Sequence, residues 1–480
     1  MKGLRSVEKI GGTSISATDK ALDNVLIAGR TGADLYGRVF VVSAFAGMTD
    51  LLLDHKKTGK PGVYAAFLAD EADHPWQEAL AEVRKAMRAV NARIFARGDS
   101  RSQADRHVEA RIRAMRTCLE DLDRLRAHGS FRLTEPLATL REMLAGMGEA
   151  HSAYCMVSLL RERGANAVLV DLTGWEAAHD FSLDARIMAG LDGIDVETQM
   201  PIVTGYAACE GGMLSRYGRG YSEITFARLA ALTRAPEAII HKEFHLSSAD
   251  PKLVGESARK IGRTNYDVAD QLANLGMEAI HPRAGRELRR AEIALRVRNT
   301  FDREDEGTLI CGDYVSDEPR VEIVTGRRSL FALQFFEQDM VGEKGYDAAI
   351  LDCLARHKAW IVSKSSNANT ITHHLSTNAT IIRQVIEDLE GRYPSATVTA
   401  RAVSMVSVIG SDISAPGLVA QAMSALSGAG IVVIGLQHQI RNVDVQFLVE
   451  NGDFDRAVQV LHDALIATPL ADDFGALEAA

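Results

Sequence analysis

Residues Lys9 to Ser14 read Lys-Ile-Gly-Gly-Thr-Ser, directly after a short segment, Ser6-Val7-Glu8, that is typical of a strand. Two glycines at the end of a strand let backbone N–H groups approach a phosphate closely, and the neighbouring lysine adds a positive charge. The stretch is not a Walker A loop, because the lysine precedes the glycines. A glycine pair after a strand is more often only a turn, so we treat this stretch as a candidate phosphate loop.

Outward from this loop, short β-branched apolar runs alternate with helical patterns over roughly the first 300 residues, at 39–42, 167–170, 202–203 and 238–240. This alternation is typical of an α/β domain with a mainly parallel sheet. Over about 76–127 the apolar residues recur every three or four positions, which predicts two amphipathic helices forming a hairpin. We therefore expect one α/β domain over 1–315.

The remainder of the chain contains an internal repeat. Two segments resemble each other at an offset of 72 residues, with Gly345 matching Gly417 and Leu354 matching Leu426. Each copy has a strand, a glycine-containing turn, a helix and a second strand, which predicts two small α+β domains, over 320–396 and 400–472. The joint between two such units is a natural ligand cleft, although a plain dimerisation module would show the same repeat.

Composition narrows the class of protein. The chain has 480 residues and a net charge of −10, which indicates several domains and argues against a general nucleic-acid binder. Five widely spaced cysteines form no Cys-x-x-Cys pair, so we expect reduced thiols rather than zinc or disulfides. We also expect no signal peptide and no membrane segment, and hence a cytoplasmic location without nucleic-acid or membrane partners.

Three further motifs carry polar residues suited to a small ligand. In Val41–Thr49 a buried strand opens into a small-residue loop, where Ser43 and Thr49 could bind a polar ligand at the strand's carboxyl end. Gly148–Ser152 reads as the start of a helix, with Glu149 able to pair with a cationic group or to be a solvated first-turn acid.

Tyr217–Glu223 reads Tyr-Gly-Arg-Gly-Tyr-Ser-Glu, which places Arg219 on a tight turn and Ser222 at the expected N-cap of the following helix. A helix start with an adjacent arginine can receive a carboxylate or a phosphate. Together these motifs indicate phosphoryl transfer to a carboxylate, which is ionised at neutral pH and needs no general base. Catalysis would then be positioning plus stabilisation of charge. A lone histidine such as His241 or His281 receives no catalytic role from its chemistry alone.

In this order the motifs resemble those of the aspartate kinases in the amino-acid kinase family. Lys9–Ser14 resembles the family's Lys-Phe-Gly-Gly-Thr-Ser signature, and Gly218–Ser222 resembles its Gly-Arg-Gly-x-Ser segment. Ser-Ala-x-x-Gly-x-Thr, Gly-Glu-x-x-Ser and Ile-His-Pro elements lie at the matching places, and the repeats resemble tandem ACT domains. The resemblance covers nearly the whole chain. It implies a mainly parallel sheet sandwiched by helices, followed by two ferredoxin-like ACT domains.

The resemblance also implies roles for individual residues. ATP and L-aspartate would be the substrates, Mg²⁺ would be held mainly by the nucleotide phosphates, and the product would be 4-phospho-L-aspartate. The family's ACT units pair between subunits, which implies a homodimer. Lys9 is the implied catalytic residue. The implied nucleotide contacts are Lys9, Gly11, Gly12, Thr13, Ser14, His241 and Lys242. The implied substrate contacts are Ser43, Thr49, Glu149, Arg219, Ser222 and Glu223. The implied effector contacts are Met340, Gly345, Ile361, Asn367 and Asn369.

Three positions depart from the family pattern. Glu223 stands in place of Asp, His241-Lys242 in place of Thr-Asp, and Glu278 in place of Lys. These departures, and the segment from His55 to Tyr64, resemble the aspartate kinases associated with ectoine synthesis. In lysine-inhibited relatives an acidic residue lies near the position of Val362, so lysine inhibition is not expected. Two alternatives stay open: a non-catalytic amino-acid sensor on a degenerate kinase domain, and a kinase of another small carboxylate such as glutamate.

Overall fold

A computed structural model describes residues 1–55, 58–69, 73–175, 181–277 and 279–467. The chain divides into two units, and each is considered by itself. The first comprises Met1–His245 and Ile280–Gly312, and the second comprises Leu246–Ala279 and Asp313–Ala480. This division differs from the predicted boundary at 315, because Leu246, Val268 and Leu272 belong to a hydrophobic cluster formed with strands of the second unit. Glu278 lies outside the described residues.

The strands of the first unit form a sheet in the order β3-β4-β2-β1-β5-β7-β8. All neighbouring strands are parallel except β7 and β8. Their bounds are β1 Ser6–Ile10, β2 Arg38–Val42, β3 Ala167–Val170, β4 Met200–Thr204, β5 Ala238–Lys242, β7 Leu295–Asn299 and β8 Thr308–Cys311. β1, β2 and β4 are buried at every position, as expected for central strands of a parallel sheet covered on both faces. The expected α/β class is confirmed.

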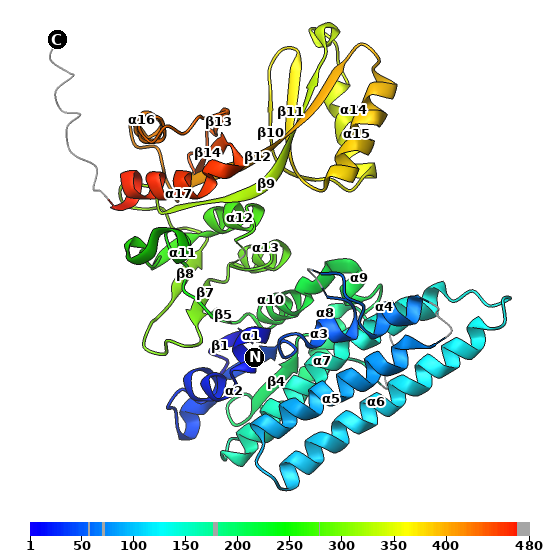
Figure 1. Cartoon of the computed structure of the whole chain (residues 1–480). Helices are drawn as coiled ribbons and strands as arrows, with labels where there is room; N and C mark the ends of the chain where they lie inside the picture. Colours follow the sequence, from blue (N-terminus) through cyan, green and yellow to red (C-terminus); the bar gives the residue numbers. More distant parts are fainter. Residues whose placement is uncertain (56–57, 70–72, 176–180, 278, 468–480) are drawn as a thin grey trace. The chain divides into compact units, whose positions relative to one another are not determined.

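Helices of the first unit flank this sheet, at α1 Gly12–Ser16, α2 Thr18–Lys20, α3 Met48–Leu52, α4 Val63–Leu68, α5 Pro75–Ile94, α6 Asp99–Arg126, α7 Thr134–Glu162, α8 Leu183–Leu191, α9 Met213–Tyr217, α10 Tyr221–Thr233 and α13 Pro282–Arg290. The predicted hairpin is α5 and α6, which run side by side in Figure 1. None of the helices in the described ranges combines the length and apolar character needed to cross a bilayer.

The Gly148–Ser152 motif lies in the middle of α7 and not at a helix start, which corrects the sequence expectation. A Cβ added at Gly148 would lie 2.6 Å from the Cβ of Ala44, so this glycine lets α7 approach the loop after β2 closely. The central part of α7 is buried on all sides. The polar residues of the motif therefore sit inside the unit because the central part of the helix does.

The second unit is built on a six-stranded antiparallel sheet in the order β10-β11-β9-β12-β14-β13. The strands are β9 Ile323–Phe336, β10 Trp360–Ser366, β11 Thr370–Ser376, β12 Thr397–Ile409, β13 Gly435–His438 and β14 Asp444–Val449, and a short strand β6 spans Arg263–Asn265. The helices are α11 Pro251–Val254, α12 Tyr266–Asn274, α14 Tyr346–Arg356, α15 Ala379–Arg392, α16 Leu418–Gly428 and α17 Phe454–His462.

The predicted repeat corresponds to two βαββαβ halves of this sheet that share the long strands β9 and β12. Residues 323–327 and Leu330 of β9 pair only with β12, whereas 331–336 pair with both β12 and β11. The second half therefore takes its last strand from a segment that precedes the first half in sequence, and it is discontinuous. Gly345 and Gly417 occupy equivalent places, because each adopts a left-handed conformation at the N-cap of an 11-residue helix.

Candidate active site

The phosphate loop follows β1, and its glycines are explained by close packing. A Cβ on Gly12 would lie 2.8 Å from the backbone oxygen of Ala44, so the loops after β1 and β2 touch at this point. A Cβ on Gly11 would lie 3.8 Å from Lys9 Nζ, and a longer side chain there would occupy the space beside the ammonium group. Ser14 is buried, with its hydroxyl 3.5 Å from the His241 carbonyl oxygen. The loop thus keeps open the space next to Lys9.

Motifs from four separate parts of the chain line one cavity of about 590 Å³, which lies at the carboxyl ends of the parallel strands. Gly12 and Thr13 come from the phosphate loop, and Glu149 comes from α7. The remaining lining residues are Ser43, Ala44, Phe45, Ala46, Gly47, Thr49, Asp50, His55, Arg219, Tyr221 and Ser222. Most of the residues predicted from separate motifs are therefore brought together at a single ligand-sized cavity.

Glu149 is a buried carboxylate with an incomplete set of partners. Its Oε1 lies 3.5 Å from the hydroxyl of Ser222, and its Oε2 accepts no hydrogen bond from the described residues. Burial raises the pKa of Glu149 to about 7, against the lowering effect of neighbouring hydrogen-bond donors that include Tyr221 and Ser222. A cationic group in the cavity would supply the missing partner. Ser222 is not the N-cap of α10 that we expected, because α10 begins one residue earlier, after Gly220.

Arg219 already holds carboxylates of its own chain. Its Nη1 donates to Asp50 Oδ1 at 2.6 Å, and its Nη2 lies 3.2 Å from Asp54 Oδ2 and donates to the Asp54 backbone oxygen. The guanidinium therefore sits in a position where it binds carboxylates, as the sequence indicated. Asp50 and Asp54 were missed by sequence reasoning, and the only signal for them was their place beside the Ser43–Thr49 loop.

Glu223, Lys9 and Lys242 form a separate ionic cluster. Lys9 Nζ lies 3.3 Å and Lys242 Nζ 3.2 Å from the same oxygen, Glu223 Oε1. The backbone N–H of His281 donates to Glu223 Oε2 at 2.5 Å. The two lysines thus engage one carboxylate oxygen and the His281 N–H engages the other, although Glu223 was predicted among the substrate contacts.

The ring of His241 points into the interior, although we expected it near the nucleotide. Its Nε2 lies 2.8 Å from Oε2 of Glu8, which also pairs with Arg38 at 2.8 Å. All three side chains are buried, and the Arg38 guanidinium and the His241 imidazole hold the pKa of Glu8 well below its usual range in spite of burial. His241 reaches the phosphate loop only through its backbone oxygen, which accepts from the Gly11 N–H at 3.4 Å.

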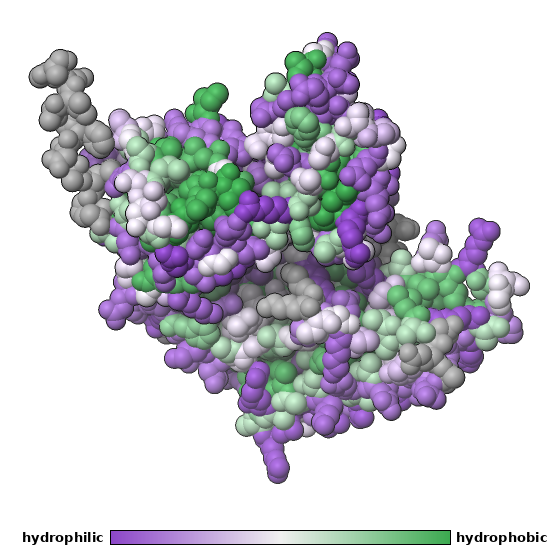
Figure 2. Space-filling model, turned by 45° about the horizontal axis from the view of Figure 1, so that its top comes forward, coloured by the Kyte–Doolittle hydropathy of each residue, from purple (hydrophilic) through white to green (hydrophobic). Residues whose placement is uncertain are grey.

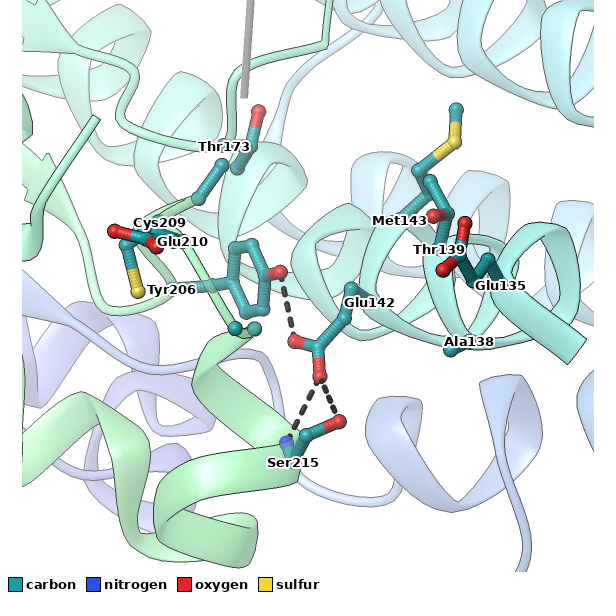
Figure 3. A pocket seen from close by; sticks show the side chains of 13 residues that line it. Glu135, Ala138, Thr139, Glu142, Met143, Thr173, Tyr206, Cys209, Glu210 and Ser215 are labelled. Carbon is teal, nitrogen blue, oxygen red and sulfur yellow. Dashed lines mark hydrogen bonds between the residues drawn. The ribbon is translucent and has the colours of Figure 1, made fainter. Parts of the chain in front are cut away.

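Tyr221 occupies the variable position of the Gly-Arg-Gly-x-Ser segment and was missed by the sequence analysis. It lines the cavity, is 2% exposed, and packs edge-on against Tyr206 with ring centroids 5.5 Å apart. Beside Tyr206 lies a second cavity of about 610 Å³, shown in Figure 3. There Glu142 accepts hydrogen bonds from the Tyr206 hydroxyl and from the backbone and hydroxyl of Ser215. These bonds hold the segment that leads into Arg219.

Comparison with known proteins identifies the family of the chain. The model of the amino acid kinase family matches residues 5–299, and a model of an ACT domain matches residues 406–465. The aspartate kinase Ask_Ect of Stutzerimonas stutzeri is 48% identical over 96% of this chain and 98% of its own length. The chain belongs to the aspartate kinases of the amino acid kinase family.

More distant aspartate kinases agree in sequence and in fold. The aspartokinase of Geobacillus stearothermophilus is 28% identical over 67% of this chain and 81% of its own. The structure of E. coli aspartokinase III in complex with lysine and aspartate superposes with a TM-score of 0.73 at 21% identity, covering 96% of this chain and 99% of that one. The complex of the same enzyme with aspartate and ADP gives a TM-score of 0.71 at 22% identity, with the same coverage. These similarities establish the shared fold.

Proposed function

We propose that the protein transfers the γ-phosphoryl group of ATP to the β-carboxylate of L-aspartate, which gives 4-phospho-L-aspartate and ADP. The observation that carries this proposal is the cavity of about 590 Å³ that joins a glycine-rich loop to a guanidinium and to the buried Glu149, whose Oε2 accepts no hydrogen bond from the described residues. An α-amino acid with a second carboxylate has a complementary group for each of them. Its ammonium group suits the buried carboxylate, one carboxylate suits the guanidinium, and the other can face the glycine-rich loop. Membership of the aspartate kinases supports the choice of aspartate.

In the proposed complex Arg219 receives the α-carboxylate and Glu149 receives the ammonium group, with Ser43, Thr49 and Ser222 as further polar contacts. This arrangement directs the β-carboxylate towards the phosphate loop. One of its oxygens attacks the γ-phosphorus, and the bond from phosphorus to the β,γ-bridging oxygen breaks, so that ADP leaves with the electron pair. The acceptor is ionised at neutral pH, and no general base is needed.

We expect Mg²⁺ to be held mainly by phosphate oxygens of the nucleotide and by water. Glu223, the carboxylate nearest Lys9, has both oxygens engaged by two ammonium groups and an N–H, which leaves it poorly suited as a metal ligand. A bound Mg²⁺ would neutralise phosphate charge and orient the triphosphate. The residues of the chain that we propose at the transferred group are Lys9 and the Gly11–Thr13 backbone.

Trapping the acyl phosphate with hydroxylamine tests this function directly. Purified protein with MgATP and L-aspartate should yield aspartyl hydroxamate, and L-glutamate should yield none. Hydroxamate from glutamate alone would retain the fold and replace the substrate. No product from either acceptor, with nucleotide binding absent by calorimetry and the protein folded by circular dichroism, would favour the sensor alternative.

The second unit supports proposals for regulation and assembly. We propose an amino-acid effector site near Met340, Gly345, Ile361, Asn367 and Asn369, where the Glu337 N–H donates to the Asn369 backbone oxygen and ties the loop after β9 to the turn after β10. The Asn367 side chain accepts from the N–H groups of Asn369 and Thr370 and so shapes this turn. The identity of the effector stays open; equilibrium dialysis against single amino acids would identify it.

We propose that the protein is a homodimer that uses the outer surface of the second unit, on which Figure 2 shows hydrophobic side chains gathered. Ile440, Val432 and Leu436, on and beside the end strand β13, are 99%, 68% and 46% exposed. Light scattering should give twice the chain mass for the wild type and a smaller mass for Ile440→Asp.

We further propose that the product feeds ectoine synthesis. The support for this pathway is the segment that begins at His55 and the relative that is 48% identical. We also propose that the enzyme is cytoplasmic.

A further inference from the structure

Lys9 and Lys242 project from the same face of the sheet at the ends of adjacent parallel strands. In the register of β1 and β5, Lys9 lies opposite Ile240, two residues before Lys242. Residues two apart on a strand point to the same side, so both ammonium groups emerge on one face while Glu8 and His241 project from the other. The pairing of the two strands therefore fixes a pair of cations at the phosphate loop.

A single carboxylate serves both cations. Glu223, in the first turn of α10, places Oε1 3.3 Å from Lys9 Nζ and 3.2 Å from Lys242 Nζ, while its Oε2 accepts from the His281 N–H. The side chains of Lys9, Glu223 and Lys242 are only 8%, 12% and 16% exposed. The cluster is thus partly withdrawn from water and carries two positive charges against one negative charge.

This excess of charge is unfavourable unless an anion completes the site. A structural ion pair would need only one lysine, and a second ammonium group held at low exposure loses hydration without a full counter-charge of its own. The other carboxylate that acts on Lys9 is Glu243, which is exposed to solvent and screened by it. The cluster therefore has the composition of a receptor for a group more negative than one carboxylate.

We propose that Lys242 is a second catalytic cation, which binds the transferred γ-phosphoryl group together with Lys9, and that Glu223 is the positioning residue that holds both. The inference rests on the proposed kinase function. As the β-carboxylate oxygen bonds to phosphorus and the bond to the departing ADP breaks, negative charge is spread over the phosphoryl oxygens and the leaving oxygen. Two ammonium groups fixed beforehand stabilise that charge without reorganisation at the moment of transfer.

The same arrangement gives one physical reason for two departures from the family pattern. Lys242 replaces an acid at the end of β5, and Glu223 replaces an aspartate. A carboxylate one methylene longer can reach between lysines on two neighbouring strands, whereas a shorter one would fall short of them.

The ionisation of the cluster is consistent with this role. Burial alone would raise the pKa of Glu223, but the charges of Lys9 and Lys242 lower it to about 2, so the carboxylate is ionised at neutral pH. Burial and the charge of Lys242 lower the pKa of Lys9, and Glu223 opposes that shift. Removing the carboxylate should therefore make the Lys9 ammonium group easier to deprotonate.

Steady-state kinetics of Lys242→Met test the proposal. We expect kcat to fall by about 100-fold with the KM for aspartate changed by less than about threefold, because the lysine acts on the transferred group and not on the acceptor. Lys242→Arg, which retains the charge, should keep more activity than Lys242→Met. Lys20→Met, at an exposed position in the same unit, is the matched control and should behave as the wild type.

Two Glu223 variants separate positioning from plain structural support. Glu223→Asp should lower kcat by about tenfold with an unchanged thermal melt, and Glu223→Gln should shift the alkaline limb of the kcat profile to lower pH. The charged groups that act on the Lys9 ammonium group are Glu223, Lys242 and Glu243, and Lys242 is paired with Glu223. A purely structural glutamate would alter the melting temperature and leave the pH profile in place.

The outcomes distinguish this inference from the proposed function. If the wild type makes no acyl phosphate from aspartate, the proposed function fails. If the wild type is active and Lys242→Met keeps kcat within twofold, the role of Lys242 is overturned and the function stands. A rise in the KM for aspartate of more than tenfold with kcat retained would likewise overturn it, because Lys242 would then bind the acceptor.

Discussion

The two ends of the candidate active site hold their charges in opposite ways. At the phosphoryl end, Lys9 and Lys242 share one glutamate oxygen and keep a net positive charge. At the substrate end, the Arg219 guanidinium is engaged by Asp50 and Asp54, and Glu149 Oε2 has no hydrogen-bond partner among the described residues. The first end is ready for an anion, whereas the second must exchange contacts when a substrate arrives.

This difference predicts different kinetic consequences. Groups that are fixed in advance contribute mainly to stabilising the transition state, so their loss should lower kcat. Groups that change partners on binding contribute to the affinity for the acceptor, so their alteration should change KM. Mutations at the two ends can therefore confirm or contradict the comparison.

The largest effect is expected for Lys9→Met, at the phosphoryl end. We expect kcat to fall by about 10³-fold, because a buried cation at the transferred group is removed from a site of low dielectric constant. The aspartate KM should change little. The hydroxamate assay gives both constants, and calorimetry with ATP checks that the nucleotide still binds. A kcat within tenfold of the wild type would contradict the assignment of Lys9.

At the substrate end, Arg219→Ala should raise the KM for aspartate by about 100-fold, because a charge-assisted, bidentate contact to the α-carboxylate is lost. Its kcat at saturating aspartate should fall much less. Arg216→Ala, an exposed arginine three residues earlier, is the matched control. Equal effects of the two variants, or full activity of Arg219→Ala at low aspartate, would show that the acceptor binds elsewhere.

Glu149→Gln should raise the aspartate KM by roughly 10-fold, because the proposed ammonium partner loses its charge. Burial raises the pKa of Glu149 to about 7, so in the wild type the affinity for aspartate should weaken as the pH falls below 7. The variant should lack that dependence between pH 6 and 8. A wild-type KM that is flat over this range would contradict the assignment of Glu149 to the ammonium group.

The same substitution, which should weaken aspartate binding, should stabilise the folded protein. The pKa of Glu149 in the folded protein, about 7, lies above the ordinary glutamate value of 4.5, so the folded state binds the proton more tightly than the unfolded state. The stabilisation from this proton is complete below about pH 4.5 and is lost as the pH rises through 7. Glu149→Gln should therefore raise the melting temperature at pH 8 by a few degrees, and by less at pH 5.

The sequence was most informative where local signals and fold agree. Lys9–Ser14, the hairpin over 76–127 and the glycines at 345 and 417 all depend on neighbours within a few residues, and the structure contains each corresponding element. The Gly148–Ser152 motif misled us because a glycine used for close packing inside a long buried helix looks the same as one at a helix start.

Long-range pairings could not be obtained from one sequence. Arg219 meets Asp50 across 169 residues, and Lys9 meets Glu223 across 214 residues. The sharing of β9 and β12 between the two halves of the second sheet is likewise set by strand pairing and not by local pattern. Residue types alone predicted which groups belong to the site, but they could not predict which of them neutralise one another.

The smallest effect is expected for Asp50→Asn, and it tests the substrate end most directly. If Asp50 competes with the α-carboxylate for Arg219, neutralising it should lower the KM for aspartate by about two- to fivefold, the range expected for a partly exposed ion pair. The side chains of Arg219 and Asp50 are 20% and 29% exposed, which places the pair in that class. Asp54→Asn should act more weakly, because its backbone oxygen still accepts from Arg219. A raised KM in Asp50→Asn would instead mean that Asp50 orients Arg219 for the substrate, and the guanidinium would then be as fully prepared for its ligand as the two lysines.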